Sequence, residues 1–177
     1  MEIPRPRKGD RLFKPGGSWN LFAWTIADMS VAACGYKEAA DTLVARLASG
    51  SRNDGLVAPI VYCYRQYLEL RLKMITESAS WITGKKFKHD HNLLNLWQPL
   101  EQQLTQELQE RDREALEAVD ACIREMHEID PSGTAFRYPE FVSLNQKAHQ
   151  LDLGNLKEVM GRVAVFLDGT QDAWSDW

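Results

Sequence analysis

Apolar side chains recur every three or four residues along most of the chain, which is the spacing of an amphipathic α-helix. The clearest case runs from Leu56 to about Ile82, with Pro59 in the first turn and Gly84 after the end. Its apolar stripe consists of Ile60, Tyr64, Tyr67, Leu68, Leu72 and Ile75. We expect this long helix to lie at the centre of the fold. It should supply buried residues to the hydrophobic core and polar residues to a binding groove.

The pattern also predicts helices before this segment. Ser18 is placed to cap a first helix, and the pattern is interrupted at Gly35. The segment Tyr36–Ala48 then carries apolar residues at helical spacing again. The two pieces are expected to form either a hairpin or one bent helix.

Three further helical stretches follow the long helix. Residues 92–97 predict a short helical piece, and Pro99 is expected to begin a fresh turn or to kink the chain. Residues 100–129 are strongly helical in composition and very acidic, which is typical of a solvated outer face. Residues 156–167 predict a last amphipathic helix that ends at Gly169.

These elements predict a single all-α domain, an antiparallel up-and-down helical bundle, over residues 18–169. Residues 1–17 are rich in proline and basic residues and are interpreted as a basic extended arm. A loop or small hairpin is expected near residues 136–153. Residues 170–177 form an acidic, tryptophan-containing tail that is suited to dock on the domain or on another chain.

Composition narrows the class of protein. The chain has 177 residues and a formal net charge of −4, which excludes a globally basic nucleic-acid binder but not a local basic groove. No apolar run approaches the roughly 20 residues of a membrane span, and no apolar segment follows the basic start as in a secretory signal. The three cysteines are widely spaced. We therefore expect a cytoplasmic protein without membrane contact or cysteine chemistry.

The long helix carries a line of charges. Arg65, Glu69 and Lys73 recur at intervals of four residues and therefore share one face. As exposed salt bridges, such pairs would contribute a few tenths of a kcal/mol each, and spacing alone favours that interpretation. Alternatively, the same line could lie in a groove and face phosphate or a partner protein.

Two histidines, His89 and His91, lie in the polar connection after the long helix. This spacing suits metal binding poorly on a helix, and no further Cys or His is placed to complete a ligand set, so we expect no metal. His91 precedes the next helical piece, where it could form a structural hydrogen bond or act in acid–base chemistry. The sequence contains no phosphate-binding loop, dinucleotide motif or nucleophile elbow, and we expect no cofactor.

Three segments together resemble a known family. Residues 59–73 (PIVYCYRQYLELRLK) resemble the long helix of HEPN (higher eukaryotes and prokaryotes nucleotide-binding) domains, and residues 91–97 (HNLLNLW) resemble their later H-D-L-x-x-L segment. Residues 136–139 (FRYP) are similar to a segment of a subgroup of uncharacterised bacterial HEPN-like proteins. The resemblance covers residues 56–168. It implies a helical bundle, frequent homodimers, and roles in RNA cleavage, antiphage defence or toxin–antitoxin systems.

The sequence departs from this family at its catalytic motif. HEPN ribonucleases carry an Arg and a His separated by four to six residues on a late helix. Here the nearest pair is Arg124 and His127, with only two residues between them, although the two still share a helix face. In addition, Asn92 follows His91 where the family has Asp. These departures favour a binding role over the usual metal-independent cleavage.

The leading hypothesis is therefore a HEPN-like binding module of a bacterial defence or toxin–antitoxin system. We expect a homodimer that associates with RNA, a nucleotide or a protein partner in a defence complex. The expected groove residues are Arg65, Glu69, Lys73, His91 and Arg137. Arg137 lies between two aromatic residues and could stack on a base or clamp a phosphate, or instead form a buried salt bridge with Glu69.

Two other functions stay open. The first is a metal-independent endoribonuclease that uses Arg124 and His127, or a constellation of Arg65 and His91. The second is a purely scaffolding role, which the acidic surface favours. The sequence leaves undecided whether the protein is an enzyme.

Overall fold

A computed structural model describes residues 27–50, 53–84, 90–137 and 151–175, and this part of the chain is all-α, without strands. The predicted all-α bundle is confirmed at this level. None of the helices in the described ranges is long and apolar enough to cross a membrane. The α-helices are α1 (Met29–Ala48), α2 (Val57–Thr83), α3 (Leu93–Glu107), α4 (Arg113–Ile129) and α5 (Leu153–Ser175); the 3-10 helices are η2 (Asp54–Leu56), η3 (Glu110–Asp112) and η4 (Ala135–Arg137).

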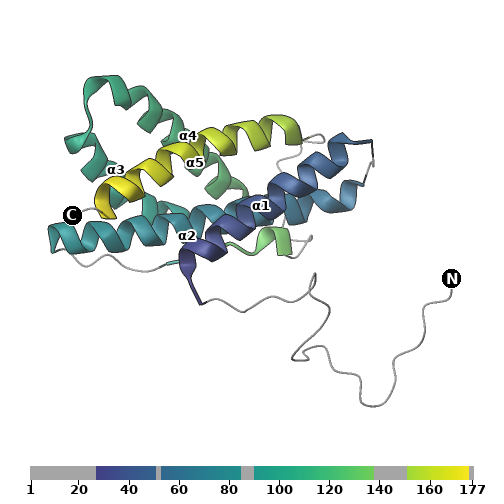
Figure 1. Cartoon of the computed structure of the whole chain (residues 1–177), viewed down its shortest axis with the longest axis horizontal. Helices are drawn as coiled ribbons and strands as arrows, with labels where there is room; N and C mark the ends of the chain where they lie inside the picture. The colour runs from purple at the N-terminus through teal and green to yellow at the C-terminus, as the bar shows by residue number, and fades with distance from the viewer. Residues whose placement is uncertain (1–26, 51–52, 85–89, 138–150, 176–177) are drawn as a thin grey trace, which may run out of the picture.

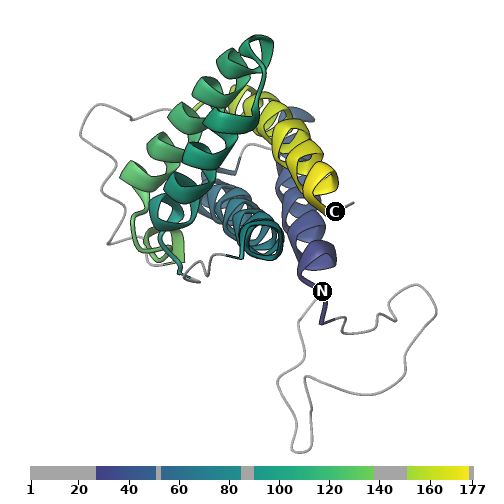
Figure 2. The ribbon, with the colours of Figure 1, turned by 90° about the vertical axis from the view of Figure 1, so that its left-hand side faces the viewer.

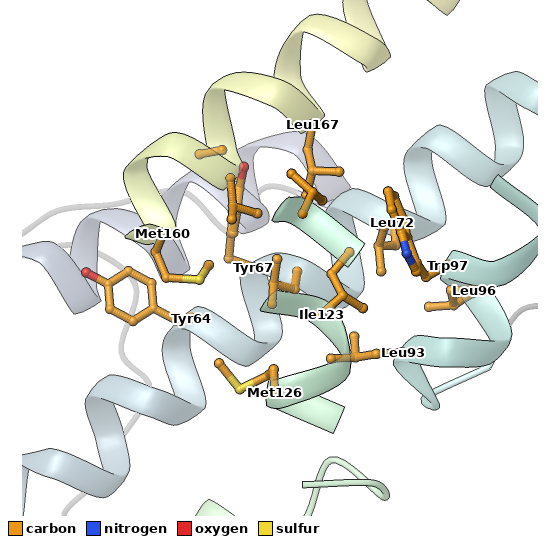
Figure 3. Packing of buried hydrophobic residues seen from close by; sticks show 14 of the residues in the cluster. Tyr64, Tyr67, Leu72, Leu93, Leu96, Trp97, Ile123, Met126, Met160 and Leu167 are labelled. Carbon is orange, nitrogen blue, oxygen red and sulfur yellow. The ribbon is translucent and has the colours of Figure 1, made fainter. Parts of the chain in front are cut away.

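Helix α2 is the element that the others surround (Figures 1 and 2). It packs against α1, α3, α5 and η4, whereas α3 packs mainly against α4 and α2. The apolar stripe predicted for α2 is buried: Tyr64, Leu72 and Ile75 are 0% exposed. Side chains of α3, α4 and α5, including Trp97, Ile123 and Leu167, complete this core (Figure 3). Each fully buried large apolar side chain contributes about 1.5–3 kcal/mol, so one central helix concentrates much of the stabilisation.

Helix α1 runs through Gly35 without a break. A glycine in a helix interior costs about 1 kcal/mol relative to alanine, which burial of Ala33, Ala40 and Val44 on α2 offsets. The carboxylate of Asp28 caps the helix by accepting from two backbone N–H groups. The interruption and the alternative of a hairpin at Gly35 are therefore wrong, whereas a single helix through this position is confirmed from Met29 onward. The proposed cap at Ser18 lies outside the described residues.

The acidic stretch expected to be one helix is divided in two. The chain leaves the helical conformation at Leu108, whose ψ is 143°, and passes through η3 before α4 begins. Leu108 packs against the core one turn after Leu104, but the next apolar residues in the sequence are Ala115 and Leu116. This gap in the apolar pattern was a readable signal for the break. Pro99 lies inside α3 and does not end it.

Helix α5 continues past Gly169 to Ser175, so residues 170–175 are helical and extend the domain. Trp174 is only 8% exposed, and its indole Nε1 donates to Glu107 Oε2 at 3.1 Å. This tryptophan therefore packs on the domain itself. The predicted basic arm over residues 1–17 lies outside the described residues, as does most of the loop or hairpin expected near 136–153, of which η4 is the described beginning.

Candidate functional site

The guanidinium of Arg65 is completely buried and joins three segments of the chain. Its Nη1 donates to Glu69 Oε2 at 3.0 Å, one turn along α2. Its Nη2 donates to the backbone carbonyl of His91 at 2.6 Å, immediately before α3. Its Nε donates to the carbonyl of Asp130 at 3.3 Å, at the end of α4. A buried charge without such partners would be strongly destabilising, so Arg65 fixes these segments relative to α2.

The turn after α4 is shaped around this guanidinium. Asp130 is 0% exposed; its Oδ2 lies 3.5 Å from Arg65 Nε, and its Oδ1 accepts from the backbone N–H groups of Thr134 and Ala135. Gly133 has a φ of +72°, and a Cβ there would lie 3.1 Å from Arg65 Nη2. Glycine is required both by this φ and by the close approach of the backbone to the guanidinium.

Glu69 is the second buried charge of the cluster. It is 3% exposed, and its Oε1 accepts from Lys73 Nζ at 2.7 Å and lies 2.8 Å from His91 Nδ1. Burial acts to raise the pKa of this carboxyl, but the hydrogen bonds from Lys73 and His91 outweigh it and hold the pKa below its usual value. Glu69 is therefore ionised at neutral pH. The spacing-based preference for exposed salt bridges is wrong, because these charges are buried.

The imidazole of His91 contacts a buried carboxylate through one ring nitrogen, and most of the ring is exposed to solvent. Its side chain is 78% exposed, although Nδ1 contacts the buried carboxylate of Glu69. Because Glu69 is ionised, Nδ1 carries the proton of that hydrogen bond, and Nε2 of the neutral ring is left as an acceptor. The ring can therefore accept a proton from a ligand, or donate to one when protonated. A fixed tautomer is the arrangement that acid–base chemistry requires.

Arg137 is exposed in η4, and no carboxylate of the described residues lies within ion-pair distance of it. The alternative that it forms a buried salt bridge with Glu69 is therefore wrong. Its charge still acts on Tyr62 of α2. Burial and the neighbouring Tyr36 raise the pKa of Tyr62, Arg137 lowers it, and Glu69 also raises it. The ring of Tyr62 meets that of Tyr36 edge-on, with centroids 6.4 Å apart. Arg137 thus borders the same side of α2 as the cluster.

The two residues of the alternative catalytic pair belong to different clusters. Arg124 Nε pairs with Asp120 Oδ2 at 2.7 Å, and Asp120 in turn accepts from the indole of Trp97. His127 lies within the electrostatic influence of Arg65 and Asp130, and its Nδ1 is buried without a hydrogen-bond partner among the described residues. The structure therefore brings His127 towards the Arg65 cluster and does not join it to Arg124.

Of the predicted groove residues, the structure brings Arg65, Glu69, Lys73 and His91 into one cluster and places Arg137 at its border. Arg65 is too deeply buried to touch a ligand, so it can only position the others. Sequence reasoning missed Asp130 and Gly133. Residues 130–133 have the composition of a turn, which was a signal for a chain reversal. Nothing in that composition indicated a contact with the buried Arg65, which lies much earlier in the chain.

Comparison of the chain with protein-family models, with curated proteins and with solved structures finds no significant match. The site must therefore be interpreted from its own geometry.

Replacing Glu69 by alanine should reduce the free energy of unfolding by roughly 3–5 kcal/mol, because it removes the carboxylate that is hydrogen-bonded to the buried guanidinium of Arg65 and leaves only that of Asp130, 3.5 Å from Nε. The matched control is Glu158→Ala, which removes the carboxylate of the exposed pair with Arg162 at the same four-residue spacing on α5. That change should cost less than about 1 kcal/mol. Urea denaturation of both variants measures the difference, and equal small losses would contradict the role given to Glu69.

His127 should make stability depend on pH. Burial, and next the charge of Arg65, lower the pKa of His127 below its usual value of about 6.5. Below that pH the unfolded chain therefore takes up a proton more readily than the folded one, so the contribution of the neutral ring is present above about pH 6.5 and is lost as the pH falls.

Wild-type protein is expected to lose more unfolding free energy than His127→Gln between pH 7.5 and pH 5.5, as measured by urea denaturation at each pH. Both proteins retain His91, so the difference between them isolates His127. Parallel pH profiles for the two proteins would show that His127 is not held neutral by the fold.

Proposed function

We propose that this chain is a HEPN-like module, an antiparallel up-and-down bundle that associates with RNA or nucleotides. The bacterial defence or toxin–antitoxin context, a homodimeric state and a partner protein in a defence complex rest on the sequence resemblance alone. One observation supports a link between the resemblance to HEPN domains and the candidate site around Glu69. The described parts of the three segments that carry the resemblance meet around α2: Arg65 donates to the carbonyl of His91, and η4 with Arg137 packs on α2.

The proposed ligand-binding surface consists of Tyr62, Lys73, His91 and Arg137, arranged around the buried carboxylate of Glu69. Arg113, Arg124 and Arg162 are each neutralised by a carboxylate of the neighbouring helical turn, whereas Arg137 has no such partner among the described residues. An unpaired guanidinium can bind a phosphate with two parallel hydrogen bonds. The ammonium of Lys73 adds a donor, the imidazole of His91 adds one when it is protonated, and the ring of Tyr62 offers a surface for a base.

Arg137→Ala should weaken binding of a fluorescently labelled single-stranded RNA about tenfold, because one charge-assisted phosphate contact is lost. The slope of log Kd against log salt concentration should fall by about 0.7, the value for one phosphate contact with a single strand. Fluorescence anisotropy measures both quantities.

The control for this prediction is Arg162→Ala, which removes an exposed, paired arginine from α5 and should leave Kd and slope unchanged. If wild-type protein did not bind the RNA at micromolar concentration, or if both variants lost affinity equally, the proposed function would be wrong.

A second function, metal-independent RNA cleavage at His91, is favoured by the contact between Nδ1 of His91 and Glu69. Nε2 would accept the proton of the ribose 2′-hydroxyl while the 2′-oxygen attacks the adjacent phosphorus. The 5′-oxygen would leave as the P–O bond breaks and would take a proton from water. Arg124 is less suited to this role, because Asp120 holds its guanidinium.

In EDTA, wild-type protein should then cleave a mixed RNA pool to products with 2′,3′-cyclic phosphate ends. His91→Ala should abolish this cleavage and His127→Gln should retain it, which gel electrophoresis and end analysis would establish. Cleavage that persisted in His91→Ala but disappeared in His127→Gln would instead support the Arg124 and His127 pair. No cleavage by any of the proteins would leave binding alone.

A further inference from the structure

A cavity of about 200 Å³ lies between the start of α2, the second half of α4, η4 and the start of α5. Its walls include Val61, Met126, Phe136 and Met160, each at most 8% exposed. The cavity is partly open to solvent. For comparison of size, an apolar cavity of about 150 Å³ admits a molecule of the size of benzene. This cavity therefore has room for an apolar group of about six carbon atoms, whose contacts would replace those that the empty space lacks.

Two walls of the cavity are methionines from different helices. Figure 3 shows Met126 extending from α4 and Met160 from α5, both towards α2. Methionine has three rotatable bonds and a polarisable sulfur, so such walls adapt to apolar groups of different shape. A wall with two methionines is therefore suited to bind a small apolar group.

The described polar residues that line the cavity carry negative or neutral groups. Glu125, Asp152 and Asn155 are exposed, and no Lys, Arg or His is among the described residues that line it. Burial is the main cause that raises the pKa of the Cys122 thiol, which also lines the cavity; Glu125 raises this pKa further and the nearby Arg162 lowers it. Asp152 Oδ1 accepts from the backbone N–H of Asn155 at the start of α5. The carboxylates of Glu125 and Asp152 make the described part of the mouth more favourable for a positive charge than for a carboxylate.

We propose that this cavity is a binding site for a small amphiphilic cation, with an apolar group of about six carbons inside and an ammonium group beside Glu125 and Asp152. The site adjoins the surface around His91 and Arg137, because Val61 and Phe136 of its lining are the chain neighbours of Tyr62 and Arg137. Its lining residues differ from those of that surface, and its existence does not depend on RNA binding. Three probes with the same chain and different head groups test it: hexylammonium, hexanoate and hexanol, each added to the full chain.

The measurement is NMR of the chain with labelled methionine methyl groups. Hexylammonium should shift the Met126 and Met160 signals saturably, whereas Met29 on α1 and Met74 on α2, outside the cavity lining, serve as internal controls that should not move. Hexanoate should bind at least about tenfold more weakly than hexylammonium. The exposed substitution Glu125→Lys should reduce or reverse that preference while leaving hexanol binding unchanged.

A larger side chain at the wall provides the second test, because Met160→Trp should fill the cavity and abolish all three shifts at Met126. If this variant failed to fold, the comparison of the three probes on wild-type protein and on Glu125→Lys would still decide the matter. The proposal is overturned if no probe shifts Met126 and Met160, if hexanoate binds as tightly as hexylammonium, or if Met29 and Met74 respond equally.

Discussion

A buried guanidinium must find its hydrogen-bond acceptors and its opposite charge within the protein, and Arg65 imposes this requirement on the whole structure. Its acceptors come from α2 itself, from the residue before α3 and from the end of α4. The hydrophobic core holds the helices together, but apolar contacts are not directional. The hydrogen bonds of Arg65 therefore specify where the connecting turns lie, and with them the positions of His91 and Arg137.

The cluster separates residues that hold the site from residues that can meet a ligand. Arg65, Glu69 and Asp130 are buried and mutually compensated, so they are too inaccessible to bind a polymer such as RNA. The imidazole of His91 and the guanidinium of Arg137 are exposed and project from segments that pack on α2. An exposed imidazole with a buried carboxylate behind it is pre-organised, because its tautomer is set before any ligand arrives.

The local elements of this fold were predictable from sequence, and the long-range contacts were not. The apolar spacing of α2 and the common face of Arg65, Glu69 and Lys73 follow from helix geometry alone. Whether that face is exposed or buried depends on His91 and Asp130, which are distant in sequence and have no periodic relation to α2. Continuation of α1 through Gly35 was likewise decided by packing, which outweighs the intrinsic preference of one residue.

The central claim is that Arg65 holds both the start of α3 and the turn after α4. Amide hydrogen exchange in Arg65→Met tests it most directly, because exchange reports local opening. The amides of Thr134 and Ala135, bonded to Asp130, and those of Leu94 and Asn95, bonded to Asn92, should lose protection together, whereas Ala32 in α1 should not. Unchanged protection in both turns, or a uniform loss over all helices, would contradict the account.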